Sequence, residues 1–468
     1  MIEFDDRKFK ALIENVYKYG QEHIFQFWDQ LSAAQQQNLL DQVKLIDFDL
    51  ITRLTEQALG QQIIEEDLQL EAPSVISLEE RKEKDRLADE VGRQALRQGK
   101  VAAFLVAGGQ GTRLGYDGPK GMYPVTPVKK KSLFQLHAEK LLSVGRQNDT
   151  RIPWYIMTSI TNNKETKTFF KKNNYFHYRE GNIFIFTQEM IPAIDRQGKL
   201  MLDRPDHIFM NPNGHGGSIS ALWKTGALAD MKKRGIEYIF YFQVDNVLTR
   251  ICDPVYIGYH ISGSAEMSCK VVRKKYPEEK MGVLCKVDGQ LRLIEYSDMS
   301  REDMYAKNSD GSLKLWAGNI ATHLFDRKFL EKENESGFKL PYHLAEKSIA
   351  YLDESGKLMQ PQGKNGIKFE TFVFDALADA RNIVCIEVDR SQEFSPLKNR
   401  EGENSPETIR KDLIRVCTDW LNAAGKKRLS EGQDAVEISP LVSLQGENLN
   451  LADLNIEHTQ TGIYIDQP

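Results

Sequence analysis

The sequence has no long apolar run. Its strongest apolar stretches, 101–107 and 238–242, are far shorter than the ~20 residues that a helix needs to span a bilayer. Residues 1–6 are acidic and lack the positive charge and apolar core of a secretory signal. We therefore expect no membrane association and a location in the reducing cytoplasm.

The cysteines are few and widely spaced. The five are separated by 17, 16, 100 and 32 residues, and no Cys-x-x-Cys pair occurs. Their positions are Cys252, Cys269, Cys285, Cys385 and Cys417. Neither a disulfide framework nor a zinc cluster is indicated.

A large excess of charge of either sign is also lacking. Among 468 residues, 62 Lys and Arg stand against 67 Asp and Glu, a net charge of −5. Such a chain has no broad positive field to attract nucleic acid, so we expect no nucleic-acid partner. Nothing in the composition indicates a protein partner. A small-molecule enzyme remains open, and at ~150 residues per domain the length predicts two or three domains.

Apolar periodicity predicts three parts. Residues 1–98 read as a helical region with apolar residues at three- and four-residue steps. Strand and helix patterns alternate in 99–392, the predicted catalytic domain, and 393–468 reads as a small α+β tail carrying Lys398. The alternation predicts an α/β fold with a Rossmann-like, mostly parallel sheet, whose ligands bind beyond the carboxyl ends of the strands.

Several elements can be assigned within this frame. The expected strands are 101–107, 154–158, 182–186 and 238–244. The expected helices are 133–144, capped by Ser132, and 162–172, 217–233, 366–380 and 405–424. Asp288-Gly289 is expected to be the turn between the segments 282–287 and 291–296.

The strongest local signal is a glycine-rich loop after the predicted strand 101–107. The loop contains Gly108, Gly109, Gly111 and Thr112. Glycines let backbone amides approach an anionic ligand, and the cations Arg113 and Lys120 that follow suit a polyphosphate. An ordinary strand-to-helix turn would explain such a loop if it stood alone.

Two common phosphate loops are excluded by spacing. A dinucleotide fingerprint needs Gly or Ala where this chain has Leu114, and the Gly-Lys-Ser/Thr triplet of a Walker loop is absent from the sequence. The pattern Gly-x-Gly-Thr-Arg followed by Pro-Lys instead resembles the signature loop of nucleotide-sugar pyrophosphorylases. In that family the loop wraps a nucleoside triphosphate.

Three further segments fit the same chemistry. Gln188 has an amide with a donor and an acceptor, and its surroundings resemble the uracil-reading segment of the family. Gly214 and His215 lie in a glycine-rich turn before a predicted helix, where free amides can meet a base or a phosphate. Asp245 directly follows the expected strand 238–244, and its carboxylate is a suitable ligand for Mg²⁺. A solvated Gln, a flexible turn and a capping Asp are the ordinary explanations of each.

The order of the motifs resembles the eukaryotic UDP-N-acetylglucosamine pyrophosphorylases in particular. Glu295-Tyr-Ser-Asp, Ala317-Gly-Asn-Ile-Ala-Thr-His, 365–375 and 393–399 complete the set. The matches follow the family order from about residue 100 to 400.

The resemblance implies a uridylyltransferase that converts UTP and a sugar 1-phosphate to a UDP-sugar and pyrophosphate, with N-acetylglucosamine 1-phosphate as the first choice. It implies that Arg113 and Lys120 hold the β- and γ-phosphates, that Asp245 holds Mg²⁺ and that Lys398 binds the transferred phosphate. Gln188 and Gly214 are expected to read uracil. The expected sugar site is formed by Gly282, Glu295 and Asn319.

One departure keeps alternatives open. Enzymes for N-acetylglucosamine usually have Asn where this chain has His215, and His at this position resembles UDP-glucose or broad-specificity UDP-sugar pyrophosphorylases. A UDP-sugar-dependent glycosyltransferase is a further alternative, although such enzymes usually need Asp-x-Asp and the strand here ends in Asp-Asn. A non-catalytic UDP-sugar-binding protein is the last.

Overall fold

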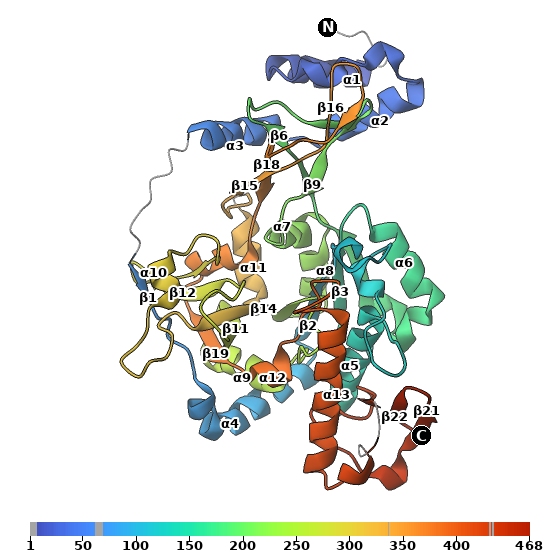
Figure 1. The fold of residues 1–468 in the computed structure, drawn as a ribbon, viewed down its shortest axis with the longest axis vertical. Coiled ribbons are helices and arrows are strands. Elements are labelled where there is room, and N and C mark those ends of the chain that lie inside the picture. The colour runs from blue at the N-terminus through green and yellow to red at the C-terminus, as the bar shows by residue number, and fades with distance from the viewer. Residues whose placement is uncertain (1–6, 61–68, 336, 430–431, 433–434) are drawn as a thin grey trace. The chain divides into compact units, whose positions relative to one another are not determined.

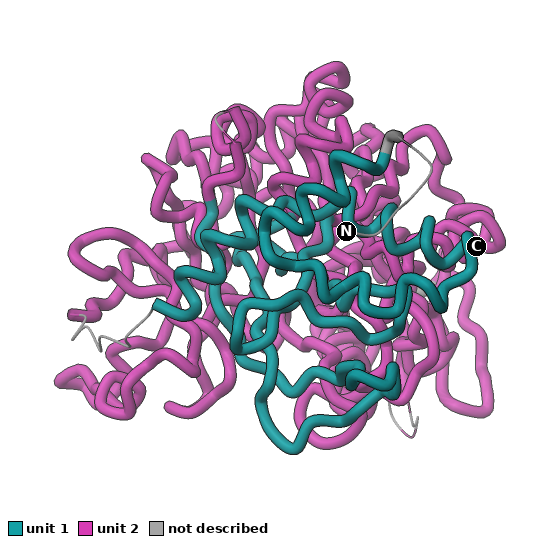
Figure 2. The backbone as a smooth tube through the Cα atoms, turned by 90° about the horizontal axis from the view of Figure 1, so that it is seen from above, with its two compact units in different colours: residues 1–67, 189–217, 340–373 teal, residues 68–188, 218–339, 374–468 magenta. Residues whose placement is uncertain are grey.

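The computed structural model describes residues 7–60, 69–335, 337–429, 432 and 435–468. These residues form two compact units (Figure 2). The smaller unit combines described residues from 1–67 with 189–217 and 340–373, and the larger unit contains those from 68–188, 218–339 and 374–468. Each unit is therefore built from three separate stretches of chain.

A large mixed sheet organises the larger unit. Four adjacent strands run parallel in the order β10 (Tyr238–Gln243), β2 (Val101–Val106), β3 (Trp154–Thr158) and β4 (Ile183–Thr187). On the other side of β10 the sheet becomes largely antiparallel, beginning with β14 (Ala317–Asp326). The predicted α/β fold class is confirmed.

The remaining strands extend the sheet beyond β14. β12 and β11 pair antiparallel with β14, β13 and β1 pair with β12, and β19 pairs parallel with β11. Their bounds are β1 (Leu70–Glu71), β11 (Met267–Arg273), β12 (Val283–Val287), β13 (Gln290–Ile294) and β19 (Ile383–Glu387).

Local sequence explains the central elements. The run that forms β2 is apolar throughout and buried on both faces, as parallel strands covered by helices require. The predicted cap is confirmed, because the Ser132 side chain accepts a hydrogen bond from the Gln135 backbone N–H at the start of α5 (Leu133–Gln147). Asp288 and Gly289 both have positive φ, 51° and 76°, as a two-residue type I′ hairpin turn needs.

Helices flank the sheet, and α4 packs against α9 (Figure 1). The helices of this unit are distributed along the chain. Besides α5, they include α4 (Leu78–Arg97), α6 (Asn163–Lys172), α8 (Ala227–Lys233), α9 (Pro254–Ser262), α10 (Arg301–Tyr305), α11 (Arg327–Glu335), α12 (Arg390–Glu393) and α13 (Pro406–Ala423). α7 (Gly217–Lys224) begins at the last residue of the smaller unit's 189–217 stretch.

The end of the chain adds a small three-stranded sheet. It contains β20 (Val436–Ile438), β21 (Asn455–Thr459) and β22 (Gly462–Asp466), and it shares an apolar core with α13. No helix in the described part of the chain is long and apolar enough to cross a membrane.

The smaller unit packs three helices on short strands from distant segments. The helices are α1 (Arg7–Lys18), α2 (Ala33–Val43) and α3 (Phe48–Gly60). The strands are β5 (Met190–Pro192), β6 (Ile194–Asp195), β7 (Leu202–Arg204), β8 (His207–Ile208), β9 (Met210–Pro212), β15 (His343–Lys347), β16 (Tyr351–Leu352), β17 (Leu358–Met359) and β18 (Gly366–Glu370).

Two helix predictions are corrected by the structure. The segment 366–380 is a strand, β18, followed by a 3₁₀ turn at Val373–Ala378. Ile367 and Phe369 alternate with polar residues and enter the core of the smaller unit, which is the period of a strand. The segment 217–233 is two helices, because Gly226, with φ 78°, separates α7 from α8.

Candidate active site

Three of the predicted segments follow strands of the parallel part of the sheet. The glycine-rich loop follows β2, Gln188 follows β4, and Asp245 comes two residues after the end of β10. Carboxyl ends of parallel strands meet at one edge of the sheet, where open α/β sheets bind ligands. Gly108 and Gln188 are close neighbours, since a Cβ built on Gly108 would lie 3.1 Å from Gln188 Nε2. Gly108 therefore allows the largely buried Gln188 amide to lie against the loop.

The loop turns back on itself. The Lys120 backbone N–H donates to Gly109 O at 3.1 Å, and the Gly111 N–H donates to Gly118 O at 2.8 Å. A Cβ on Gly109 would meet nothing within 4 Å, so the space beside this residue is open. The fold of the loop thus brings Lys120, eleven residues along, next to its beginning.

Arg113 and Thr112 occupy a short 3₁₀ turn (Thr112–Leu114) within the loop. Both residues are exposed, in contrast to the half-buried Lys120. An exposed guanidinium on a loop can reach a ligand that approaches from solvent.

Lys120 and Asp245 form an ion pair. Lys120 Nζ lies 3.0 Å from Asp245 Oδ2, and the side chains are 17% and 12% exposed. Burial opposes ionisation of Asp245, but the ammonium groups of Lys120 and Lys398 outweigh it and hold the pKa of Asp245 below its ordinary value. Asp245 is accordingly a carboxylate at neutral pH, and Lys398 is close enough to act on it.

Hydrogen bonds fasten the segment that carries Lys398 to the end of β10. The Leu397 backbone N–H donates to Asp245 O at 2.9 Å. The Asn246 side chain donates to Glu393 O at 2.8 Å and accepts from the Ser395 N–H at 2.9 Å. The structure therefore brings together charged residues from three distant parts of the sequence, and we call Lys120, Asp245 and Lys398 the charged cluster.

The three residues predicted to receive the sugar also lie together. A Cβ on Gly282 would lie 3.1 Å from Glu295 Oε1, and the Asn319 backbone N–H donates to Gly282 O at 2.9 Å. Asn319 Oδ1 accepts from the Ala321 N–H at 3.1 Å, so the NH₂ group is what the side chain offers a ligand. β14 runs antiparallel to β10, so its amino-terminal end, with Asn319, lies at the sheet edge where β10 ends. We call Gly282, Glu295 and Asn319 the neutral-contact cluster, because Gly282 and Asn319 contact each other through a main-chain hydrogen bond and Glu295 is its one carboxyl group.

Gly214 and His215 belong to the smaller unit. Gly214 has φ 83°, and a Cβ there would lie 2.3 Å from Thr371 O, so only glycine fits. His215 Nδ1 accepts a hydrogen bond from the Val373 N–H at 3.1 Å. Burial, assisted by the charge of His343, lowers the pKa of His215 to about 4. The imidazole is therefore neutral at pH 7 and carries its proton on Nε2.

Comparisons with known proteins show the family of the chain. The family model described as UTP--glucose-1-phosphate uridylyltransferase matches residues 48–460. The chain belongs to this family. The predicted enzyme class, a nucleotidyltransferase of the UDP-sugar pyrophosphorylase type, is thereby confirmed.

Individual relatives of this uridylyltransferase-family chain cover most of its length. It is 38% identical to the UDP-N-acetylhexosamine pyrophosphorylase-like protein 1 of Homo sapiens, over 92% of both chains. It is 36% identical to the UDP-N-acetylglucosamine pyrophosphorylase of Saccharomyces cerevisiae, over 92% of this chain and 94% of that protein. The crystal structure of the uridine diphosphate N-acetylglucosamine pyrophosphorylase of Trypanosoma brucei superimposes with a TM-score of 0.82 and 26% identity, over 97% of this chain and 95% of that one.

In this uridylyltransferase-family chain, Asp245 is the residue that fits a divalent cation. Mg²⁺ takes oxygen ligands and usually combines one or two protein carboxylates with substrate phosphates. Asp245 is ionised, and the described residues contain no group of three or more His, Cys, Asp or Glu side chains that would form a metal cage. A single carboxylate of this kind fits a metal that arrives with a phosphorylated substrate.

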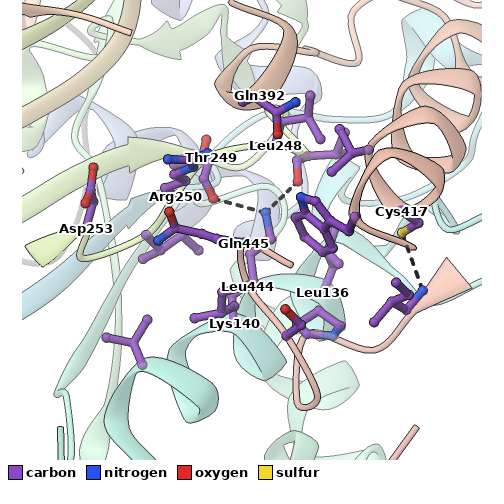
Figure 3. Close-up of a pocket in the computed structure, with 18 of the residues that line it drawn as sticks. Leu136, Lys140, Leu248, Thr249, Arg250, Asp253, Gln392, Cys417, Leu444 and Gln445 are labelled. Atoms are coloured by element: carbon purple, nitrogen blue, oxygen red, sulfur yellow. Dashed lines mark hydrogen bonds between the residues drawn. The ribbon is translucent and has the colours of Figure 1, made fainter. Parts of the chain in front are cut away.

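A cavity of about 90 Å³ is lined in part by residues 247–251, the segment that follows Asp245 and Asn246 (Figure 3). Lys140 of α5 lines it and donates to the carbonyls of Val247 at 2.6 Å and Thr249 at 3.0 Å. Burial lowers the pKa of Lys140 to about 7. None of the predicted site residues is among the described residues that line the cavity, so it is separate from the predicted site.

Sequence reasoning missed the residues that hold the site segments in place. Asn246 is hydrogen-bonded to the segment that carries Lys398, and Asn162 is hydrogen-bonded to the start of the glycine-rich loop. The position of Asn246, directly after Asp245 at a strand end, was the available signal. No local pattern marked Asn162.

Proposed function

We propose that the protein transfers the uridylyl group of UTP to N-acetylglucosamine 1-phosphate, forming UDP-N-acetylglucosamine and pyrophosphate. The observation that carries the proposal is the charged cluster, in which two lysines and one carboxylate meet at a ligand-binding sheet edge. The N-acetylated sugar is supported by the relatives in Saccharomyces cerevisiae and Trypanosoma brucei, which are named as UDP-N-acetylglucosamine pyrophosphorylases.

The proposed reaction is a direct displacement at phosphorus. A phosphate oxygen of the sugar 1-phosphate attacks the α-phosphorus of UTP in line, a new P–O bond forms, and pyrophosphate leaves from the opposite side. The attacking phosphate is already an anionic nucleophile at neutral pH, so no general base is needed. Catalysis comes from positioning the two substrates and from neutralising charge.

The cations have separate tasks in this scheme. Arg113 and Lys120 hold the β- and γ-phosphates and stabilise the leaving pyrophosphate. Lys398 neutralises charge on the α-phosphate or on the incoming phosphate. Lys120 is paired with Asp245 in the unliganded chain, so binding of the triphosphate gives Lys120 a second anionic partner.

Asp245 would hold Mg²⁺. The ion, when bound, supplies positive charge to the phosphate oxygens. Lys120 and Lys398 keep Asp245 ionised, which preserves the carboxylate as an oxygen ligand.

Different residues recognise the uracil base and the sugar. In the larger unit, Gln188 reads the uracil, while Gly108, Gly109, Gly111 and Thr112 wrap the nucleotide. The uracil contact expected of Gly214 and His215, which belong to the smaller unit, stays a prediction from the family resemblance. The neutral-contact cluster receives the sugar, with Glu295 accepting from hydroxyl groups and the NH₂ group of Asn319 meeting the N-acetyl carbonyl.

A UDP-glucose or broad-specificity UDP-sugar pyrophosphorylase is the second candidate. It is favoured by His215, because the enzymes for N-acetylglucosamine that this chain resembles usually have Asn at this position. The two candidates share the reaction and differ in the sugar.

The test is pyrophosphate release from UTP and Mg²⁺ with N-acetylglucosamine 1-phosphate, N-acetylgalactosamine 1-phosphate or glucose 1-phosphate in parallel. We expect the highest kcat/KM with N-acetylglucosamine 1-phosphate. Higher kcat/KM with glucose 1-phosphate selects the second candidate. Release of UDP from a UDP-sugar and an acceptor, without pyrophosphate, would identify a glycosyltransferase, and UTP binding without turnover would identify a binding protein.

A further inference from the structure

Asn162 lies between the end of β3 and the start of α6, and its side chain is hydrogen-bonded to the glycine-rich loop. Its side chain is completely buried. Nδ2 donates to Ala107 O at 3.1 Å and to Gly109 O at 3.3 Å, and Oδ1 accepts from the Ser159 backbone N–H at 2.9 Å. The amide thus joins the ends of two neighbouring strands, β2 and β3.

The position of Asn162 in α6 makes this use of the amide informative. Asn is a preferred N-cap residue, because its side-chain oxygen can accept from the free N–H groups of the first helical turn. Asn162 is the N-cap of α6, yet its side chain makes no capping hydrogen bond within this described helix. The amide is turned toward the loop instead of serving its own helix.

The two carbonyls that Asn162 binds determine where the neighbouring N–H groups point. In a trans peptide the carbonyl oxygen and the following N–H point in opposite directions. Holding Ala107 O and Gly109 O toward Asn162 therefore directs the N–H groups of Gly108 and Gln110 away from it. Successive backbone N–H groups on a glycine-rich loop are the usual donors to phosphate oxygens.

We propose that Asn162 is a positioning residue for the triphosphate, which sets the orientation of the peptide groups from 107 to 110. The inference rests on the proposed function, since it assumes that this loop binds UTP. Asn162 itself does not touch the substrate. It acts by holding two carbonyls on the protein side of the loop, so that the N–H groups on the other side are fixed before UTP arrives.

The main test is Asn162→Ala, with KM measured separately for UTP and for the sugar 1-phosphate. Loss of the two donated hydrogen bonds removes the Asn162 contact from Ala107 O and leaves Gly109 O with the Lys120 N–H. We expect KM for UTP to rise about tenfold while KM for the sugar 1-phosphate stays within twofold. A residue that only stabilises the fold would not separate the two substrates. An unchanged KM for UTP in folded Asn162→Ala overturns the proposal.

Asn163→Ala is the matched control. Asn163 is the next residue on the same helix end, and its Oδ1 accepts a hydrogen bond from Thr158 Oγ1 at 3.0 Å rather than contacting the loop. The control removes an identical amide beside the same strand, and we expect KM for UTP to stay within twofold. A rise equal to that of Asn162→Ala would mean that the end of α6, and not the loop contact, is responsible.

Asn162→Asp separates the donor from the acceptor. The carboxylate can still accept from the Ser159 N–H, and a negative charge suits a helix N-terminus, but it has no hydrogen to give to Ala107 O or Gly109 O. We expect Asn162→Asp to raise KM for UTP at least as much as Asn162→Ala. Wild-type KM for UTP in Asn162→Asp would contradict the donor role.

Calorimetric titration of UTP with each variant distinguishes this inference from the proposed function. Weaker UTP binding by Asn162→Ala in a protein that never releases pyrophosphate would leave the inference standing and remove the reaction. Normal UTP affinity of Asn162→Ala in an active enzyme would remove the inference alone. A wild-type protein that binds no UTP would overturn both.

Discussion

The charged cluster and the neutral-contact cluster are built in different ways. In the charged cluster, Lys120, Asp245 and Lys398 come from separate segments and meet through an ion pair and long-range hydrogen bonds. In the neutral-contact cluster, Gly282 and Asn319 come from neighbouring strands and meet through a main-chain hydrogen bond and close packing.

In the proposed reaction, this difference separates the rate of the reaction from the choice of sugar. There the formal charges act on the phosphates, which are the same for every sugar 1-phosphate. The Glu295 carboxyl group, which follows β13, and the Asn319 amide in β14 are proposed to act on the groups by which sugars differ. We therefore expect variants of the first cluster to lower activity with all sugars, and variants of the second to change the preference among them.

The largest effect is expected for Lys398→Ala. Lys398 is exposed, so its removal should leave the melting temperature nearly unchanged, while loss of one charge-stabilising donor lowers kcat/KM about 10²-fold or more. Initial rates of pyrophosphate release with two sugar 1-phosphates measure this loss, which should be equal for both. Arg400→Ala, which removes an exposed cation two residues away, is the control and should retain wild-type rates. Wild-type turnover in Lys398→Ala would remove Lys398 from the mechanism.

Asp245→Asn should have the next largest effect. The change removes the proposed oxygen ligand of Mg²⁺ and the counter-charge of Lys120 while keeping the shape of the side chain. We expect kcat/KM to fall about 10²-fold when the concentration of free Mg²⁺ is saturating for the wild type. Adding more Mg²⁺ should not restore the activity. A titration of activity against Mg²⁺ is the measurement. A half-saturation and plateau equal to those of the wild type would refute the metal assignment.

Asn319→Ala should have a smaller and more selective effect. The NH₂ group proposed to meet the N-acetyl carbonyl is lost together with the hydrogen bond that the Ala321 N–H donates to Asn319 Oδ1, and the main-chain hydrogen bond from the Asn319 N–H to Gly282 O remains possible. We expect kcat/KM to fall about tenfold with N-acetylglucosamine 1-phosphate and less than twofold with glucose 1-phosphate. Equal losses with the two sugars would count against the contact and would weaken the distinction between the clusters.

The smallest effect is expected for His215→Asn. Asn can still accept the hydrogen bond that Val373 donates, so we expect the ratio of kcat/KM between the two sugars to change by about threefold or less. The pKa of His215 is lowered to about 4, so the ring is neutral throughout the range from pH 5.5 to 8 and is protonated only below it. The pH profiles of wild type and His215→Asn should therefore have the same shape. An acid limb near pH 6.5 that disappears in the variant would contradict the neutral ring.

The parallel half of the sheet was predictable from sequence because its signals are local. The strands β2 and β10 are continuous apolar runs followed by glycine or by Asp-Asn, so both their position and their ligand-binding ends were visible. The helix prediction at 366–380 was wrong because β18 is stabilised by pairing with β15 and β6, which lie far away in the chain.

The site was predictable to a similar extent. Lys120, Asp245 and Lys398 lie in recognisable motifs, and the structure brings them together. The supports of the site were not predictable, because Asn162 binds carbonyls 55 and 53 residues away and Asn246 binds a carbonyl 147 residues away. An asparagine that serves a distant backbone leaves no periodic pattern near itself.

The most direct test of the account is one set of kcat/KM values for pyrophosphate release. Wild type, Lys398→Ala and Asn319→Ala are each assayed with UTP, Mg²⁺ and either N-acetylglucosamine 1-phosphate or glucose 1-phosphate. The account predicts that Lys398→Ala lowers both values by the same factor of about 10² or more, and that Asn319→Ala lowers only the value for the N-acetylated sugar. A sugar preference changed by Lys398→Ala, together with equal losses in Asn319→Ala, would contradict it.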